Sequence, residues 1–345
     1  MIDVGSDHAD VADELRRLRS WWDAPDGPLV MSTSGSSGEP KRVALSRAAL
    51  AASVAATETR LGGPGQWVLD LPVDRIAGLQ VLLRSIAAGT EPVVASEHPT
   101  YDAAVAAVDA DRAYTAVVPT QLHRLATSGR LSVLRRFDAV LVGGAAVRAD
   151  LMRCCADEGV RVVRTYGMTE TCGGCVYDGV PLDGVGVRIA ADGRVHVAGP
   201  VLFDGYEGDA EATSRALVDG WFVTEDLGRL DDDGRLVVLG RFDDVVVSGG
   251  ANVSLPAVTE ALVGLGGVTD AVAVGLPDDE WGTRVVACLA CHGPTPQLAE
   301  VREHVATRLP RAWAPRSVVP VDAVPRLPGG KVDRLALRRL AEEGT

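Results

Sequence analysis

The sequence contains almost no lysine. Of its 34 basic residues, all except Lys41 and Lys331 are arginine. The 47 acidic residues outnumber the basic ones, so the formal net charge is −13. A chain this acidic repels both phosphate backbones and anionic lipid surfaces. We therefore expect no nucleic-acid partner and no membrane partner.

The chain lacks the segments that direct proteins into or across membranes. Its N-terminal residues are polar and acidic, whereas a secretory signal has a basic stretch followed by an apolar one. No apolar stretch without charges reaches the roughly 20 residues that span a bilayer. We expect a cytoplasmic protein, in which thiols remain reduced.

Cysteines are few and occur in close pairs. There are six, at Cys154–Cys155, Cys172–Cys175 and Cys288–Cys291. The two C-x-x-C pairs leave a four-thiolate zinc site as an alternative. They are more than a hundred residues apart, however, and Cys288 and Cys291 lie in a stretch typical of a buried strand. We therefore interpret these cysteines as small hydrophobic residues.

The composition that remains is that of an ordinary globular protein. Hydrophobic residues make up 47% and charged residues 23%, which excludes disorder and collagen-like repeats. A length of 345 residues predicts two domains, or one large domain with an appendage.

Over residues 8–167, short apolar strands alternate with helical segments. The predicted strands are 28–33, 67–72, 91–96, 114–119, 137–144 and 160–167. The predicted helices are 8–22, 46–61, 76–88, 101–109, 120–128 and 148–158. This alternation predicts an α/β fold with a mostly parallel sheet and helices on both faces.

After Gly174 the pattern changes to hairpins and then to a small α+β segment. Residues 186–199 and 226–241 are apolar runs with Asp-Gly turns, which is typical of β-hairpins. We place the domain boundary between a large N-terminal domain (1–240) and a small C-terminal domain (241–345). In the latter we expect strands at 245–248, 271–276, 284–291 and 317–321, and helices from Pro256, over 297–308 and over 333–342.

A loop rich in hydroxyl groups and glycine follows the first predicted strand. It reads Ser-Thr-Ser-Gly-Ser-Ser-Gly-Glu-Pro-Lys over residues 32–41. Small residues expose backbone N–H groups, hydroxyls donate to phosphate oxygens, and the lysine adds a mobile positive charge. The Walker pattern G-x-x-x-x-G-K-[ST] is absent. A phosphate-binding loop and an ordinary surface loop both fit this composition.

The rarity of lysine favours phosphate binding. Lys41 and Lys331 both lie in loops rich in Gly and Pro, in a chain that otherwise uses arginine. An ammonium group is a compact donor on a flexible stem, whereas a guanidinium is planar and bulky. A site where one small cation must reach between oxygens accepts lysine but not arginine. The alternative is that the two lysines have no shared purpose.

Six motifs resemble, in order, those of the adenylate-forming superfamily, which includes acyl-CoA synthetases, luciferases and nonribosomal adenylation domains. Spread over residues 32–333, they are far more specific together than any one alone. They are the loop at 32–41, Tyr166-Gly167-Met168-Thr169-Glu170, Thr224-Glu225-Asp226, Gly240-Arg241-Phe242-Asp243-Asp244, Ser248-Gly249-Gly250-Ala251-Asn252-Val253 and Pro328-Gly329-Gly330-Lys331-Val332-Asp333.

Within this superfamily, the chain resembles the o-succinylbenzoate–CoA ligases of menaquinone biosynthesis, in their short actinobacterial form. The resemblance implies an AMP-forming ligase that activates a small carboxylic acid with ATP and Mg²⁺ and transfers the acyl group to coenzyme A. It leaves a homodimer open. The residues that carry it are Leu71-Pro72, Ile76-Ala77-Gly78-Leu79-Gln80, Arg84-Ser85, Ala88-Gly89-Thr90 and Thr169-Glu170-Thr171-Cys172-Gly173-Gly174-Cys175.

The resemblance also implies a role for each motif residue. Lys331, Thr169 and Glu170 are expected to be catalytic, with Glu170 also holding Mg²⁺. Asp243 is the expected hinge, about which the C-terminal domain rotates to admit coenzyme A. The residues expected to bind nucleotide or coenzyme A are Thr33, Ser34, Gly35, Ser36, Ser37, Gly38, Lys41, Gly143, Gly144, Ala145, Tyr166, Gly167, Asp226, Arg241, Ser248, Gly249 and Gly250.

The helix at 76–88 is expected to contact the acid. Gln80 and Arg84 are four residues apart and share one helical face. Arg84 is a candidate to bind a second carboxylate as a fork, and its extension into solvent is the alternative. Arg75, a third candidate, stands where the family often has His, which leaves another aryl or keto acid open as substrate. Arg42 stands where Gly is usual.

Two other functions are open at this point. One is an adenylation enzyme that loads a carrier protein, although no carrier domain is identifiable in the sequence. The other is a nucleotide-binding module without activity, against which the intact Lys331, Glu170 and Asp226 argue.

Overall fold

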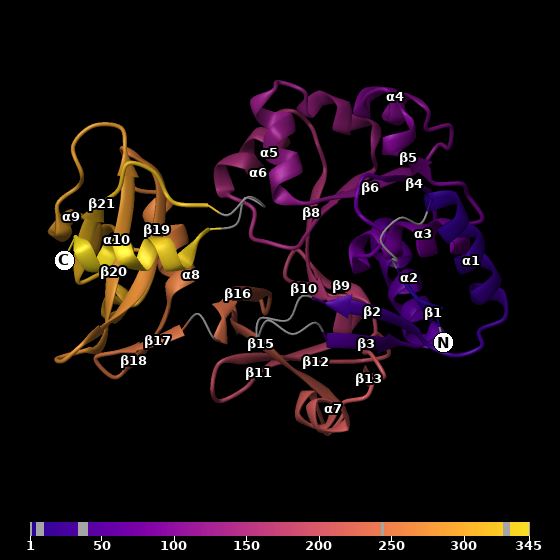
Figure 1. Cartoon of the computed structure of the whole chain (residues 1–345). Helices are drawn as coiled ribbons and strands as arrows, with labels where there is room; N and C mark the ends of the chain where they lie inside the picture. Colours follow the sequence, from indigo (N-terminus) through magenta and orange to yellow (C-terminus); the bar gives the residue numbers. More distant parts are fainter. Residues whose placement is uncertain (1, 5–9, 34–40, 243–244, 327–331, 345) are drawn as a thin grey trace. The chain divides into compact units, whose positions relative to one another are not determined.

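The computed structural model describes residues 2–4, 10–33, 41–242, 245–326 and 332–344 (Figure 1). The chain divides into two compact units, which we describe separately. The first comprises Met1–Arg188, His196–Thr224 and Leu230–Leu236, and the second comprises Ile189–Val195, Glu225–Arg229 and Val237–Thr345. The predicted division at residues 240 and 241 stays a prediction.

The largest sheet among the described residues has the strand order β10-β9-β8-β7-β6-β4-β5. Strands β4 to β8 are parallel, whereas β9 and β10 are antiparallel to their neighbours. The bounds are β4 Gln66–Leu69, β5 Val93–Val94, β6 Ala113–Val117, β7 Ala139–Val142, β8 Val162–Met168, β9 Gly173–Tyr177 and β10 Val180–Pro181.

Both faces of this sheet are covered by helices. Ala139 and Leu141 of β7 belong to one buried cluster, and Val140 and Val142 belong to another, because successive side chains of a strand point to opposite faces. The first cluster includes residues of α1 (Val11–Asp23), α2 (Arg47–Leu61) and α3 (Ile76–Ala88). The second includes residues of α4 (Tyr101–Ala106), α5 (Pro119–Thr127) and α6 (Ala149–Asp157). Short 3-10 helices are η1 Ala95–Glu97, η2 Leu131–Arg136 and η3 Thr169–Thr171.

Two further sheets complete this part of the chain. One has the order β1-β2-β3-β13, with bounds β1 Ile2–Asp3, β2 Leu29–Thr33, β3 Lys41–Leu45 and β13 Gly205–Tyr206. The other has the order β11-β12-β15-β14, with β16 beside β15, and contains both predicted hairpins. Its bounds are β11 Gly186–Ile189, β12 Arg194–Ala198, β14 Leu217–Val218, β15 Trp221–Leu230 and β16 Leu236–Arg241. Helix α7 is Ala210–Ala216.

The C-terminal part is the expected small α+β structure. Its sheet has the order β18-β17-β20-β19, and β21 pairs in parallel with β20. The core is again divided by strand alternation, since Ala287 packs with α8 and α9 whereas Cys288 packs with α10. The bounds are β17 Val245–Ser248, β18 Ala251–Ser254, β19 Val268–Asp278, β20 Gly282–Cys291, β21 Ser317–Pro320, α8 Leu255–Val263, α9 Leu298–Ala306, η5 Arg311–Trp313 and α10 Arg334–Glu343.

The predicted α/β class is confirmed, and each strand and helix expected before residue 168 corresponds to an element. The sequence prediction was wrong in omitting short elements such as β3, β13, β18 and α7. Each of these strands pairs through its backbone with another strand, so hydrophobic pattern alone does not reveal it. In the described part of the chain, every helix is too short or too polar to cross a membrane.

Candidate active site

Predicted nucleotide-binding residues follow two neighbouring parallel strands. Gly143–Ala145 come directly after β7, and Tyr166 and Gly167 lie at the end of β8. Because β7 and β8 are parallel, their carboxyl ends meet at one edge of the sheet, where α/β folds bind ligands. A side chain at Gly143 would lie 2.4 Å from Thr165 Oγ1, and Gly144 has φ +82°. Glycine therefore lets the backbone itself form this edge.

Hydrogen bonds within the protein stabilise the turn that carries Thr169 and Glu170. Thr171 Oγ1 donates to Gly173 O at 2.7 Å and accepts from Met168 N at 2.9 Å. Cys172 adopts the left-handed conformation with φ 51°. Its carbonyl accepts from Ser53 Oγ at 2.9 Å and from Gln80 Nε2 at 2.6 Å. Gln80, expected beside the acid, thus fixes the turn, and the contribution of Ser53 was not foreseen.

Glu170 is half-buried and contacts a tyrosine that the sequence did not single out. Tyr206 donates its hydroxyl to Glu170 Oε1 at 3.0 Å. The ammonium of Lys41 lies 4.8 Å from the centre of the Tyr206 ring. Tyr206 is 36 residues from Glu170 along the chain, so no local spacing could have revealed it.

The phosphate loop is described at its two ends. Thr33 and Lys41 face each other across the antiparallel pair β2 and β3, and Thr33 Oγ1 lies 3.4 Å from the Lys41 carbonyl. This pairing closes the loop into a hairpin. Other predicted site residues lie outside the described residues: Ser34, Gly35, Ser36, Ser37 and Gly38 of the loop, the predicted hinge residue Asp243 and the predicted catalytic residue Lys331.

Arg84 does not extend into solvent, so that alternative is wrong. The residue is 3% exposed, and burial lowers the pKa of its guanidinium. Its Nη2 lies 3.3 Å from Thr57 Oγ1 and 3.5 Å from the Tyr177 hydroxyl, and the group is 4.9 Å from the Trp67 ring centre. Its Nε has no hydrogen-bond partner among the described residues.

Arg75, by contrast, is exposed at the start of α3. It is the N-cap residue but makes no side-chain capping bond. Its Nε lies 3.6 Å from Asp74 Oδ2 on the surface, a pairing that contributes little in water. Arg75 is therefore available to a ligand but is not built into a defined polar cluster.

The predicted ribose-binding pair lies on adjacent strands. Asp226 on β15 is 8% exposed, and Arg241 Nη1 at the end of β16 lies 3.5 Å from Asp226 Oδ1. This separation is that of an ion pair without close hydrogen-bond geometry. Asp226 thus lies beside Arg241, as the resemblance to the family motifs predicted.

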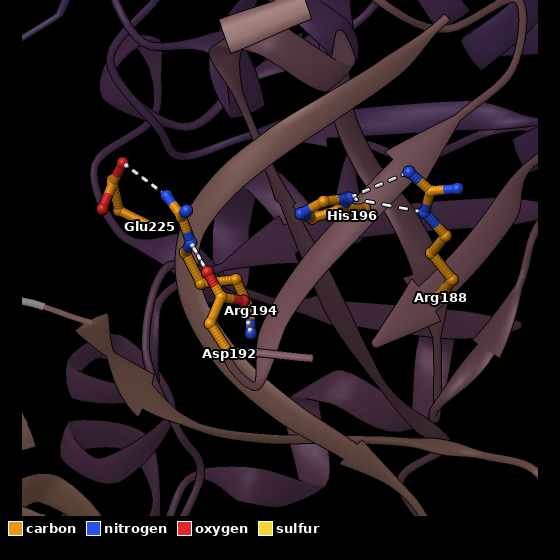
Figure 2. Close-up of polar contacts among 5 residues, drawn as sticks. All are labelled: Arg188, Asp192, Arg194, His196 and Glu225. Atoms are coloured by element: carbon orange, nitrogen blue, oxygen red, sulfur yellow. Dashed lines mark hydrogen bonds and ion pairs between the residues drawn. The ribbon is translucent and has the colours of Figure 1, made fainter. Parts of the chain in front are cut away.

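Charged side chains at the neighbouring positions are also paired, which the sequence did not suggest (Figure 2). Arg194 lies between two carboxylates, 2.7 Å from Asp192 Oδ2 and 3.7 Å from Glu225 Oε1, and 5.1 Å from the Phe242 ring centre. Because Glu225 precedes Asp226, Arg194 helps to fix the strand that carries the ribose candidate. Figure 2 also shows Arg188 directed at His196, with Nε and Nη2 each 3.4 Å from Nδ1.

The predicted coenzyme A motif forms a tight turn. Ser248 ends β17, and Gly249 and Gly250 have φ 57° and 78°, as in the two-residue turns that connect hairpin strands. The Gly249 N–H donates to the Trp281 carbonyl at 3.0 Å. Ser248 Oγ is buried without a hydrogen-bond partner among the described residues.

The described residues fit a magnesium ion that is held mainly by the phosphates of a bound nucleotide. None of them form a group of three or more His, Cys, Asp or Glu side chains able to hold a metal. Mg²⁺ commonly takes one or two protein carboxylates and completes its shell with water and phosphate oxygens. Glu170, at the ligand-binding edge of the sheet, suits that role.

The interpretation of the cysteines as small hydrophobic residues holds where they are buried and is wrong for Cys154, which is exposed. Cys172, Cys175 and Cys288 are fully buried, and Cys288 lies in the expected strand, β20. Burial raises the pKa of the Cys175 thiol to about 12 and that of Cys288 to about 11. Their interpretation as small hydrophobic residues is confirmed for these three.

Comparison with protein families decides the class of this fold. Residues 5–206 match the family described as AMP-binding enzyme, and residues 257–331 match its C-terminal domain. The chain belongs to the AMP-binding enzyme family. The resemblance drawn from the six motifs is therefore confirmed, and a nucleotide-binding module without activity is set aside.

Individual AMP-binding enzymes match most of the chain. A Mycobacterium tuberculosis relative named "probable 2-succinylbenzoate–CoA ligase" is 44% identical over 330 residues, which cover 92% of this chain and 86% of the relative. The structure of o-succinylbenzoate CoA synthetase from Bacillus subtilis with its acyl-adenylate intermediate has a TM-score of 0.75 at 28% identity, covering 90% of this chain and 68% of that one. The same synthetase with ATP and magnesium has a TM-score of 0.73 at 27% identity, with coverage of 90% and 69%.

Proposed function

We propose that this chain is an AMP-forming ligase that joins 2-succinylbenzoate to coenzyme A, a step of menaquinone biosynthesis. The observation that carries the proposal is the 44% identity to the Mycobacterium tuberculosis relative across 92% of the chain. The match to a Bacillus subtilis enzyme solved with its acyl-adenylate supports the same reaction.

In the first step, a carboxylate oxygen of the acid attacks the α-phosphorus of ATP, and the bond to pyrophosphate breaks. Two anions must approach each other, so the site must supply cations and N–H donors. We assign Lys331 to the carboxylate and α-phosphate, and Thr169 to a phosphate oxygen. The loop from Thr33 to Lys41 binds the outer phosphates.

A bound magnesium ion would supply positive charge that neutralises the phosphates. Glu170 would hold it, as the half-buried carboxylate at the edge of the sheet. A structural neighbour solved with ATP and a magnesium ion supports the use of magnesium, though not the choice of ligand residue.

The adenosine part of ATP is assigned to residues around the strand ends. Tyr166 covers the adenine, and the backbone of Gly143–Ala145 lines it. Asp226 accepts the ribose hydroxyls, with Arg241 beside it. The burial of Asp226 reduces competition from water for these hydrogen bonds.

In the second step, the thiol sulfur of coenzyme A attacks the acyl carbon, and AMP leaves. Lys331 is needed in the first step, whereas coenzyme A needs that space in the second. We therefore propose that the C-terminal domain rotates about Asp243 between the steps. Ser248, Gly249 and Gly250 then border the thiol channel.

The acid has two carboxylates, one to activate and one to recognise. Arg84 is our candidate for the second, because it is a buried cation beside Trp67 whose Nε lacks a partner among the described residues. Gln80 supports the site through the Cys172 turn, and Arg75 is an exposed candidate at its rim. Arg75 in place of the usual His favours another aryl or keto acid as the alternative substrate.

The test is the thioester itself. Purified protein is incubated with ATP, Mg²⁺, coenzyme A and a panel of aryl and keto acids, and products are identified by mass spectrometry. We expect the 2-succinylbenzoyl thioester to form at least about 10-fold faster than any other, which corresponds to about 1.4 kcal/mol of discrimination. No product from 2-succinylbenzoate beside strong product from another acid would reject the proposed substrate. The cytoplasmic location and a homodimer stay predictions.

A further inference from the structure

Tyr206 stands between two residues that the proposed function assigns to ATP. Its hydroxyl donates to Glu170 Oε1 at 3.0 Å, and the face of its ring lies 4.8 Å from the Lys41 ammonium. A hydrogen bond from a hydroxyl to a carboxylate is among the stronger ones in proteins, and an ammonium is attracted to the face of an aromatic ring. One side chain thus contacts both the candidate magnesium ligand and the last residue of the phosphate loop.

The backbone sets this position in advance. Tyr206 pairs with Val43 in the antiparallel contact between β13 and β3, and Glu207 N donates to Arg42 O at 2.8 Å. On the other side, Phe203 N donates to the carbonyl of Glu170 at 2.9 Å. The segment 203–207 therefore links the turn of Glu170 to the strand that ends the phosphate loop.

Side chains reinforce the same link. The Tyr206 ring packs edge-on against Phe203 at 5.0 Å, and Phe203 packs against Phe222 at 5.3 Å. Arg42, the residue found where Gly is usual, pairs with Glu207 and with Asp3. These contacts limit the motion of Tyr206. Less conformational entropy is therefore lost when Tyr206 orders the side chains of Glu170 and Lys41.

We propose that Tyr206 is a positioning residue for magnesium–ATP. Its hydroxyl occupies Oε1 of Glu170 and restricts rotation of the carboxylate, so that the group is already oriented before the ion arrives. Its ring holds the Lys41 ammonium near the phosphate loop. The inference rests on the proposed function, because Glu170 and Lys41 owe their roles to it. A solely structural tyrosine would need the ring but not the hydroxyl.

The two contacts can be separated by substitution. Tyr206→Phe keeps the ring and removes the hydroxyl, whereas Tyr206→Leu removes both. Affinity for ATP is measured by titration calorimetry with and without Mg²⁺, in the absence of acid and coenzyme A. For Tyr206→Phe we expect Mg²⁺–ATP to bind about 10-fold more weakly, as for loss of a hydrogen bond to a charged group. ATP without Mg²⁺ should bind within about 2-fold of wild type. Tyr206→Leu should weaken both, because Lys41 also loses its support.

Controls distinguish positioning from folding. Tyr101→Phe removes the hydroxyl of another half-buried tyrosine, which lies 3.4 Å from Thr115 Oγ1, and should leave both affinities unchanged. Melting temperatures identify any variant that is merely unstable. The double variant Tyr206→Phe, Glu170→Gln should bind Mg²⁺–ATP no more weakly than Glu170→Gln alone, because the hydroxyl acts through that carboxylate.

Wild-type affinity for Mg²⁺–ATP in Tyr206→Phe, or losses that multiply in the double variant, would overturn the inference. Failure of the wild-type protein to bind ATP would instead overturn the proposed function. The two failures are therefore distinguishable in one set of titrations.

Discussion

Burial determines the chemistry of individual side chains in this protein. Burial removes Arg84 and several cysteines from water, among them Cys172, Cys175 and Cys288, and it shifts the pKa of each group in the direction that favours the uncharged form. A buried thiol is a poor nucleophile because the reacting species is the thiolate. Cys172 directly follows the turn that carries Glu170, and Cys175 lies three residues further along β9.

The different burial of the cysteines predicts the order in which their thiols are labelled. At pH 8, with a pKa of about 12, Cys175 has about one molecule in ten thousand as thiolate. Raising the pH toward 12 would increase the thiolate fraction, because the thiolate forms when the thiol loses its proton. We expect iodoacetamide at pH 8 to modify the exposed Cys154 first and to reach Cys172, Cys175 and Cys288 only after denaturation. Peptide mass spectrometry measures the order. Early labelling of Cys175 in the folded protein would contradict it.

Helix starts are specified locally at several elements. Ser46, Thr100, Asp209 and Ser254 each accept an amide hydrogen at the beginning of a helix through the side chain. Ser254 does more, because it accepts from Ala257 N at 3.3 Å and also donates to the Leu239 carbonyl. It therefore connects the start of α8 to the strand that leads to Arg241.

Replacing Ser254 with alanine should loosen α8. Loss of an N-cap side chain costs about 1 kcal/mol, and the Leu239 carbonyl would lose a donor as well. We expect amides of Leu255–Val263 to exchange with solvent at least about 5-fold faster, measured by hydrogen-exchange mass spectrometry. Ser214→Ala, on the exposed face of α7, is the matched control and should change nothing. Equal protection in the two variants would show that the cap is unimportant.

On the scale of the whole molecule, the two lysines belong to different compact units. Lys41 falls within the first and Lys331 within the second. The proposed function assigns both lysines to ATP in the first step. The proposed rotation about Asp243 then admits coenzyme A.

Removing the lysine of the C-terminal unit should therefore separate the two steps. We expect Lys331→Ala to slow pyrophosphate exchange at least about 100-fold, as for loss of a charge-stabilising donor. Thioester formation from preformed acyl-adenylate and coenzyme A should stay within about 2-fold of wild type, because Lys331 has no role there. Equal losses in both assays would contradict the two-conformation mechanism.

Local pattern was enough to predict the parallel strands of the central sheet and its covering helices, but not the antiparallel strands β9 and β10. Helix α3 has the bounds that its apolar run predicted, and β7 has the continuous burial expected of a parallel strand. Rare residues were equally informative, since the lysines and the ordered motifs identified the family. The short strand β13 was not predicted, because its pairing with β3 joins residues that are far apart in the sequence.

Residue types in ordered motifs therefore established the reaction class, because chemistry requires particular groups whatever their surroundings. Contacts across long sequence separations could be found only in three dimensions. The carbonyl of Cys172 is supported by Ser53 and Gln80, and Glu170 is oriented by Tyr206. Such hydrogen bonds depend on angstrom-scale distances set by the packing of whole elements, and no periodicity along the chain encodes them.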